Sequence, residues 1–307
     1  MTEAPLVAVA PEDSRDWIRR AVVDGGGRLV DVRDAQALVW TAGRDPDGLR
    51  EAVAAAPQLR WVQLPWAGVE PFAAAGVFDD RRAWTSGKGV YAQPVAEHAL
   101  ALALAGLREI KRFATAGGWT DQAGISLVGG RVTVFGGGGI ARELLGLLRP
   151  FGCRVTVVRR HPGDMDGADR VLGFEERYEA LRGADAVVLA LALTPETQRL
   201  MTDIEFELME PHAWLVNVAR GEHVATGDLV NALREDVIGG AALDVTDPEP
   251  LPDGHPLWSL PNCLITPHTA NTDDMAKPLL SQRIAENVTR FAEGRELVGP
   301  VDPRLGY

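Results

Sequence analysis

Cysteine is scarce in this chain, with two residues among 307, Cys153 and Cys263. Two thiols cannot build a disulfide framework or a cysteine-rich metal cluster, and both lie in apolar runs, so we expect buried core thiols and no metal site. Long apolar runs are also missing, since no stretch reaches the ~18 residues of a membrane-spanning helix. No basic segment followed by an apolar run opens the sequence. These absences predict a soluble, cytoplasmic protein that does not bind membranes.

Positive charge is in deficit. Lys and Arg total 31 against 43 Asp and Glu, which gives a net charge of −12. This balance argues against nucleic acid or an anionic membrane as a general partner. An anionic cofactor or an acid substrate would need a locally positive cleft. The hydrophobic content of 46% is ordinary for a globular protein, and the length of 307 residues suggests about two domains.

Four consecutive glycines, Gly136 to Gly139, stand between a β-prone run and an amphipathic helical pattern, and a second β-prone run follows. The order fits the dinucleotide fingerprint as Gly136-x-Gly138-x-x-Ala141, with one glycine for a tight turn and one for close approach to a pyrophosphate. A plain glycine turn is the alternative. Because a helix N-terminus offers free N–H groups to phosphates, the predicted contacts are Gly136, Gly138, Gly139 and Ile140.

Arg159 stands about twenty residues past the glycines, where an acidic residue would bind the adenosine ribose of NAD, and Arg160 follows it. Two guanidinium groups suit a 2′-phosphate through bidentate hydrogen bonds and opposite charge. We therefore predict NADP(H) as the preferred cofactor and keep NAD(H) as the second choice. A pair of solvated surface arginines is the alternative interpretation.

Short apolar β-prone runs alternate with helical patterns along the chain, which predicts parallel α/β sheets. The run at 61–64 leads into Ala67-Gly68, a turn at the end of a strand where such sheets bind ligands, with a purely structural turn as the alternative. Residues 93–114 form the longest helical pattern, apolar on most faces, so we expect one helix buried along much of its length. Its His98 is expected to be a core histidine rather than a catalytic one.

Arg220, Glu249 and His268 lie at or just beyond the ends of predicted strands of one sheet. The carboxyl ends of parallel strands converge on one crevice, so these side chains are expected to meet. An arginine can hold a carboxylate through two parallel hydrogen bonds. A histidine oriented by a carboxylate can give a proton to a carbonyl oxygen as hydride arrives from a nicotinamide. Taken singly, each could be a surface arginine, a solvated loop carboxylate or a turn histidine.

With these residues in view, the sequence resembles the D-isomer-specific 2-hydroxyacid dehydrogenase family. The resemblance rests on FGGGGIA, LTPET at 193–197, NVARG at 217–221, DVTDPEP at 244–250 and TPH at 266–268, in the family's order, over about residues 57–293. It implies an α/β fold of two Rossmann-like or flavodoxin-like domains with doubly wound parallel sheets and a cleft between them.

The resemblance also implies domain boundaries. Residues 1–92 together with 275–307 would form the substrate (catalytic) domain, and residues 93–274 the NAD(P)-binding Rossmann domain with an interdomain helix. The polar excursion from Gly117 to Gly124 corresponds to the family's dimer-forming arm, so a homodimer is expected. The last helix, about 279–293, has a spacing that suits packing onto the first domain.

Residue roles follow from the same resemblance. Arg220 would bind the substrate, His268 would be the acid/base and Glu249 its partner. The backbone N–H groups of Ala67 and Gly68 would face the substrate carboxylate. Residues implied along the cofactor are Thr194, Thr197, Val218, Ala219, Asp244, which would hold the nicotinamide carboxamide, and His268 itself.

The similarity is greatest to the glyoxylate/hydroxypyruvate reductase branch, which tends to use NADPH. The implied function is reduction of a small 2-oxo acid to the D-2-hydroxy acid. Two positions depart from the family, Trp66 where serine is common and Asn271 where a small residue is common. The alternatives are an NAD-dependent dehydrogenase of the D-lactate or phosphoglycerate type, and a non-catalytic binding protein on the same fold, like the dehydrogenase-related corepressors.

Overall fold

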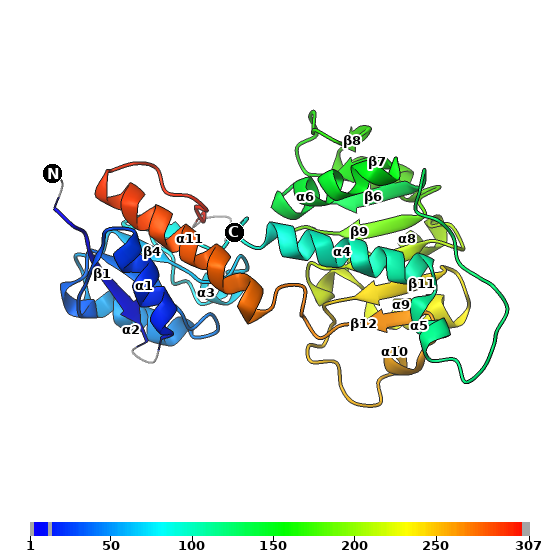
Figure 1. Ribbon diagram of the computed structural model, residues 1–307, viewed down its shortest axis with the longest axis horizontal. Helices are drawn as coiled ribbons and strands as arrows, with labels where there is room; N and C mark the ends of the chain where they lie inside the picture. The colour runs from blue at the N-terminus through cyan, green and yellow to red at the C-terminus, as the bar shows by residue number, and fades with distance from the viewer. Residues whose placement is uncertain (1–2, 12–13, 303–307) are drawn as a thin grey trace. The chain divides into compact units, whose positions relative to one another are not determined.

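Short runs of Val, Leu, Ala and Trp form the strands of two parallel sheets, one in each of two units (Figure 1). The structure is a computed structural model that describes residues 3–11 and 14–302. Unit 1 comprises residues 1–91 and 272–307, and unit 2 comprises residues 92–271. Two parallel α/β sheets confirm the predicted fold class.

Unit 2 contains a seven-stranded parallel sheet in the order β12-β11-β10-β9-β6-β7-β8. The chain starts in the middle of the sheet, moves to one edge and then returns to build the other half, which is the Rossmann arrangement. The strands are β6 (Arg131–Phe135), β7 (Arg154–Val158), β8 (Arg170–Leu172), β9 (Ala186–Leu189), β10 (Trp214–Asn217), β11 (Gly240–Leu243) and β12 (Cys263–Ile265).

Both faces of this sheet are covered, which explains why its strands are almost wholly apolar. On one face α4 and α6 pack over a cluster that includes Val134, Leu144 and Val188. On the other, α7, α8 and α9 pack over Leu189, Phe206 and Leu215. The helices are α4 (Ala92–Leu107), α5 (Ile110–Ala114), α6 (Gly139–Leu148), α7 (Arg177–Leu181), α8 (Asp203–Leu208), α9 (Thr226–Arg234) and α10 (Pro256–Ser259), with 3₁₀ turns η2 (Arg149–Phe151), η3 (Phe174–Glu176) and η4 (Gly221–His223).

The single helix predicted over residues 93–114 is wrong, because α4 ends at Leu107 and α5 begins at Ile110. Between them Glu109 takes a left-handed backbone with φ of 49°. The carbonyl of Leu107 accepts a hydrogen bond of 2.8 Å from the N–H of Ile125, in the irregular segment that leads to β6. A distant segment therefore terminates the helix.

Unit 1 contains a five-stranded parallel sheet in the order β2-β1-β3-β4-β5, the flavodoxin-like arrangement. One face is covered by α1 and α11, with Ile18, Val22 and Ile284 in the core, and the other by α2 and α3, with Leu49 and Phe72. The elements are β1 (Leu6–Ala10), α1 (Asp16–Asp24), β2 (Arg28–Leu29), η1 (Val32–Asp34), β3 (Ala37–Trp40), α2 (Pro46–Ala55), β4 (Trp61–Gln63), α3 (Glu70–Ala74), β5 (Ala83–Thr85) and α11 (Asp273–Ala292).

The last helix, α11, packs against α1 although more than two hundred residues separate them in the chain, as the apolar spacing predicted. Among the residues that the structure describes, no helix combines the length and the apolar character that crossing a bilayer requires.

Candidate active site

The glycine turn of unit 2 joins β6 to α6. Gly136 has φ of 107°, and a Cβ there would stand 2.2 Å from the carbonyl oxygen of Ala190, so only glycine fits. Gly138 differs, because a Cβ added to it would meet no protein atom within 4 Å. Ala141 is fully buried beneath the turn. The turn thus leaves open space beside its second fingerprint glycine.

The N-terminus of α6 borders this space. Gly138 is its N-cap, and no side chain caps the helix. The backbone N–H groups of the first turn, Gly139 and Ile140 among them, have no partner inside the helix by its geometry. Uncapped N–H groups beside open space fit the pyrophosphate of a dinucleotide.

Arg159 follows the end of β7 and turns toward the glycines. A Cβ on Gly137 would stand 2.6 Å from its Cδ, so the arginine stem covers that glycine. Its Nη2 donates to the Gly163 carbonyl at 3.0 Å, whereas its Nε is buried without a hydrogen-bond partner. Arg160 points elsewhere, with Nη2 3.6 Å from a carboxylate oxygen of Glu196. A buried, unused donor next to the glycine turn fits an anionic group.

The loop after β9 carries Thr194 and Thr197. The hydroxyl of Thr197 accepts a hydrogen bond from the Thr194 N–H at 2.8 Å and donates to the Ala192 carbonyl at 2.9 Å. A hydrogen bond from Thr194, helped by the Glu196 backbone N–H and the charge of Arg160, lowers the pKa of the exposed Glu196 carboxyl. The Thr197 side chain therefore shapes its own loop, and its contact with a cofactor stays a prediction.

Sequence reasoning missed His223, which lies beneath this loop. The imidazole is fully buried, with Nδ1 2.8 Å from the carbonyl oxygen of Thr197 and Nε2 3.3 Å from that of Leu191. Burial lowers the pKa of His223, although both carbonyls favour the protonated ring. Nothing in the sequence marks this position except that it follows the NVARG motif by two residues.

The turn after β10 carries Arg220. Asn217, buried at the strand end, accepts a hydrogen bond from the Ala219 N–H at 3.0 Å and donates to the Arg220 carbonyl at 2.8 Å. The Arg220 side chain donates from Nη1 to the Ala219 carbonyl at 2.7 Å. Val218 is anchored by its N–H, which donates to the Leu189 carbonyl at 3.3 Å. The NVARG motif is thus a turn held by its own asparagine.

The structure brings His268 and Glu249 together. His268 Nδ1 lies 2.9 Å from Glu249 Oε1, and the His268 side chain is half exposed. The His268 backbone is left-handed, with φ of 51°, and its N–H faces the carbonyls of Asp244, at 2.8 Å, and Thr266, at 2.9 Å. Left-handed non-glycine residues are uncommon and concentrate at functional sites. Because Nδ1 faces the carboxylate, Nε2 is the nitrogen left for another partner.

Asp244 is the most heavily hydrogen-bonded carboxylate near these residues, and it is 2% exposed. Its oxygens accept from the Thr266 hydroxyl at 2.6 Å and from the N–H groups of Thr269, at 2.9 Å, and Ala270, at 3.1 Å. Burial alone would raise the pKa of Asp244, but the hydrogen bonds of His98, Thr266 and the two N–H groups outweigh it and lower the pKa.

His98 was expected in the core, and its side chain is 22% exposed. Its Nε2 lies 3.0 Å from the Thr266 hydroxyl and 3.3 Å from Asp244 Oδ1. The residue therefore belongs to the Asp244 network, from a helix 146 positions away in sequence.

Ala67 and Gly68 lie in unit 1, in the turn after β4. Within the residues that the structure describes, neither of their N–H groups donates a hydrogen bond. Trp66, before them, is 46% exposed, and its ring covers Gly43, where a Cβ would stand 2.5 Å from the indole. In the described part of the chain, no group of three or more His, Cys, Asp or Glu is arranged to hold a metal ion.

The family model "D-isomer specific 2-hydroxyacid dehydrogenase, NAD binding domain" matches residues 98–270. An uncharacterized protein from the proB 3′ region of Corynebacterium melassecola is 36% identical over 297 residues, which cover 94% of this chain and 95% of that protein. Glyoxylate reductase from Pyrococcus furiosus is 32% identical over 285 residues, covering 87% and 82% of the two chains.

Among solved structures, a D-isomer specific 2-hydroxyacid dehydrogenase from Xanthobacter autotrophicus superimposes with a TM-score of 0.85 at 28% identity. The match covers 99% of this chain and 100% of that one. That protein was crystallised in complex with NADPH and MES.

Proposed function

Because this chain belongs to the D-isomer specific 2-hydroxyacid dehydrogenase family, we propose that it reduces a small 2-oxo acid, such as glyoxylate or hydroxypyruvate, with NADPH. Family membership makes it a nicotinamide-dependent oxidoreductase. The product would be the D-2-hydroxy acid. The observation that carries the proposal is the 2.9 Å contact between His268 Nδ1 and Glu249 Oε1, beside strands that follow a dinucleotide turn.

The proposed chemistry assigns one task to each side chain. Glu249 holds His268 by Nδ1, so that Nε2 can deliver a proton to the carbonyl oxygen of the substrate. Arg220 binds the substrate carboxylate, since a guanidinium can form two parallel hydrogen bonds with it. The bound nicotinamide supplies the hydride. We also propose that the N–H groups of Ala67 and Gly68 bind the substrate carboxylate.

The cofactor would be held largely by unit 2. The glycine turn and the start of α6 suit the pyrophosphate, and the unused Nε of Arg159 suits a 2′-phosphate. Thr194, Thr197, Val218 and Ala219 would border the cofactor, and Asp244 would hold the nicotinamide carboxamide. The NADPH found with the Xanthobacter autotrophicus protein supports NADP(H) as the preferred form, with NAD(H) as the competitor.

A steady-state assay tests the proposal. The purified enzyme is offered glyoxylate, hydroxypyruvate, pyruvate and a phosphorylated hydroxypyruvate, each with NADPH and with NADH. Glycolate from glyoxylate is achiral, so the D configuration is tested on a chiral column with the products of the other three acids. We expect the highest kcat/KM for glyoxylate or hydroxypyruvate with NADPH. Oxidation of neither cofactor by any 2-oxo acid would reject the function, and a preference for NADH with pyruvate or the phosphorylated acid would favour the D-lactate or phosphoglycerate alternative.

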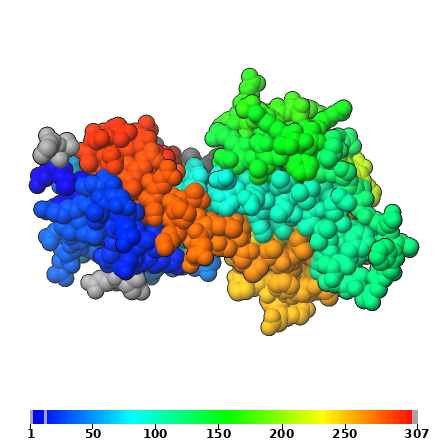
Figure 2. Space-filling model, in the orientation of Figure 1, coloured from blue at the N-terminus to red at the C-terminus, as the bar shows by residue number. Residues whose placement is uncertain are grey.

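We further propose a homodimer formed through the arm between α5 and β6. Residues 115–124 of this arm are exposed on the surface of unit 2 (Figure 2), and the Trp119 side chain is fully exposed. In the proposed dimer the partner chain would cover the Trp119 side chain. Light scattering coupled to size exclusion should give the mass of two chains, and Trp119→Ser should shift the equilibrium toward monomer. The cytoplasmic location stays a prediction.

A further inference from the structure

His223 occupies a position that ordinary packing does not explain. It ends η4, three residues after Arg220, and no part of it is exposed. Burying an imidazole costs free energy unless hydrogen bonds compensate, so an apolar residue would fill the space at a lower free-energy cost. The two ring nitrogens face two backbone carbonyls, of Leu191 and Thr197, at the two ends of the loop after β9.

The two contacts span the loop like a clasp. A neutral imidazole has one N–H, and the shorter distance of 2.8 Å assigns it to Nδ1, which donates to the Thr197 carbonyl. Nε2 then carries no hydrogen and only packs against the Leu191 carbonyl, at 3.3 Å. The ring therefore holds the end of the loop by one hydrogen bond and packs against its beginning.

Backbone hydrogen bonds join residues 199–201, just beyond the loop, to residues 222–225, which include His223. The Arg199 N–H donates to the Glu222 carbonyl at 2.8 Å, and the Met201 N–H donates to the His223 carbonyl at 2.9 Å. Ala225 returns a bond from its N–H to the Met201 carbonyl, also at 2.9 Å. The loop after β9 and the turn that carries Arg220 are thus joined into one piece.

We propose that His223 is a positioning residue for the nicotinamide dinucleotide, holding the 191–197 loop in the shape that binds the cofactor and fixing it to the Arg220 turn. This inference rests on the proposed function, because it takes the 191–197 loop to be a cofactor contact. His223 itself touches neither cofactor nor substrate. Its effect reaches them through the hydrogen bond to the Thr197 carbonyl and the packing of the ring against the Leu191 carbonyl.

Three substitutions of His223 separate the clasp from simple packing. His223→Leu fills the space without a donor and should weaken NADPH binding about tenfold, the loss expected for one buried hydrogen bond, with a smaller change in kcat. His223→Asn places an amide donor near the Nδ1 position and should recover binding to within about threefold. His223→Gln places its donor nearer Leu191 and should recover less.

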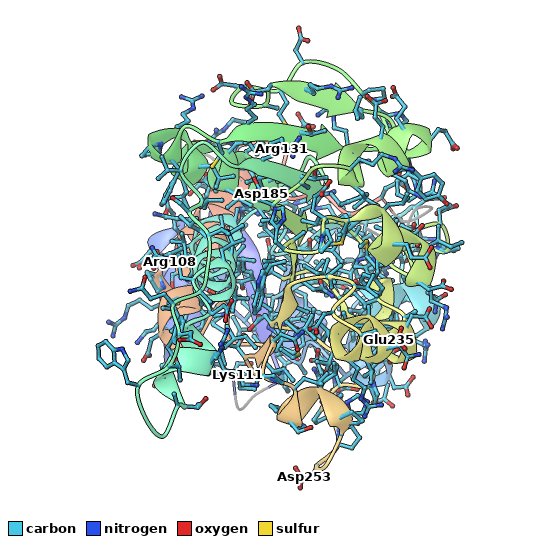
Figure 3. All side chains as sticks on the ribbon, turned by 90° about the vertical axis from the view of Figure 1, so that its right-hand side faces the viewer. Arg108, Lys111, Arg131, Asp185, Glu235 and Asp253 are labelled. Carbon is cyan, nitrogen blue, oxygen red and sulfur yellow. The ribbon has the colours of Figure 1, made fainter. Side chains whose placement is uncertain are left out.

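His212 provides the matched control. It is a half-exposed histidine whose Nε2 lies 2.7 Å from Asp185 Oδ1, just before the beginning of β9 and therefore at the opposite end of that strand from the loop. Figure 3 shows Asp185 beside Arg131. The carboxylate of Asp185 accepts a hydrogen bond of 2.7 Å from the backbone N–H of Arg131. His212→Leu should leave the Kd for NADPH unchanged.

Two measurements decide the matter. The first is the Kd for NADPH from titration of protein fluorescence, and the second is hydrogen exchange of the 191–197 amides in the apoenzyme, which should accelerate in His223→Leu while the core strands stay protected. A folded His223→Leu enzyme that binds NADPH as tightly as wild type, or exchanges its loop no faster, overturns the inference. If His223→Leu does not fold, equal Kd values for His223→Asn, His223→Gln and wild type overturn it. Wild-type protein that binds neither NADPH nor NADH rejects the proposed function itself.

Discussion

The two halves of the unit 2 sheet end in loops of opposite construction. After β6, the chain presents glycines, open space and an uncapped helix, and beside it the Nε of Arg159 is left without a partner. After β10 and β11, buried side chains fix the loops, since Asn217 and Asp244 each hydrogen-bond two backbone groups. Binding a phosphate needs exposed N–H groups, whereas orienting a reacting side chain needs every neighbour fixed.

The contrast predicts that loss of the proposed proton donor lowers turnover, whereas changes in the glycine turn lower the affinity for the cofactor. Among the substitutions proposed, His268→Asn should have the largest effect. It should lower kcat by about 10²-fold or more, the usual range for loss of a general acid, while the Kd for NADPH stays near wild type. Stopped-flow hydride transfer and fluorescence titration measure the two quantities. Near-normal turnover would remove His268 from the chemistry.

Substitution of two glycines in the same turn should have different effects, one on stability and the other on cofactor binding. Gly136→Ala places a Cβ 2.2 Å from the Ala190 carbonyl at a left-handed φ, so it should lower the free energy of unfolding by about 2–3 kcal/mol. A Cβ at Gly138 would meet nothing within 4 Å, so Gly138→Ala should unfold like wild type. It should weaken NADPH binding about tenfold, because the methyl group would occupy the place proposed for the pyrophosphate. Urea unfolding and cofactor titration of both variants measure these two effects. A Gly136→Ala protein as stable as wild type, or a Gly138→Ala protein that binds NADPH as tightly, would contradict the prediction.

Arg159→Asp should change cofactor choice rather than turnover. An acidic side chain there would repel a 2′-phosphate and accept hydrogen bonds from a ribose, so the ratio of kcat/KM for NADPH to that for NADH should fall at least tenfold. Arg160→Ala should have a smaller effect, since its guanidinium lies near Glu196. An unchanged ratio in Arg159→Asp would mean that the phosphate contact lies on other residues.

The smallest expected effect concerns pH. Burial lowers the pKa of His223 in the folded protein, so between its unfolded value of 6.5 and the lower folded value the unfolded chain binds more protons. The free energy of unfolding should therefore fall as pH drops below about 6.5, with a slope of at most about 1.4 kcal/mol per pH unit from this residue. Asp244 acts in a separate window, because its unfolded pKa is 3.8 and its folded pKa is lower.

Urea unfolding of the apoenzyme between pH 5 and 7.5 measures this slope. His223→Asn should lack the contribution while keeping those of all other groups. Identical slopes for His223→Asn and wild type would show that the ring is not held in its neutral form.

Local sequence patterns were enough to predict the sheets and the glycine turn. Apolar runs bounded by glycine and polar residues predicted β6 and β7, because strands covered on both faces leave almost no polar position. The strands β2, β5 and β8 were missed, since each has only two or three residues and one or more of them is exposed. The break between α4 and α5 was also missed, because Ile125, whose N–H donates to the Leu107 carbonyl, lies outside the helical pattern.

The candidate site was only partly predictable for the same reason. Arg220, Glu249 and His268 could be proposed because each follows a strand. The contacts of His98 with Asp244 and of His223 with Leu191 join residues 146 and 32 positions apart, and periodicity carries no information about such pairs. A single buried histidine looks the same in sequence whether it fills a core or fastens a loop.

The left-handed backbone at His268 has one more consequence. Main-chain torsion sets the direction of the Cα–Cβ bond, and the Asp244 carbonyl keeps that torsion in place through the His268 N–H. Moving the residue to an ordinary extended conformation would send the imidazole to another side of the chain. The backbone thus fixes the orientation of the proposed proton donor before substrate or cofactor binds. The binding energy of these ligands then remains available for bringing the reacting atoms together.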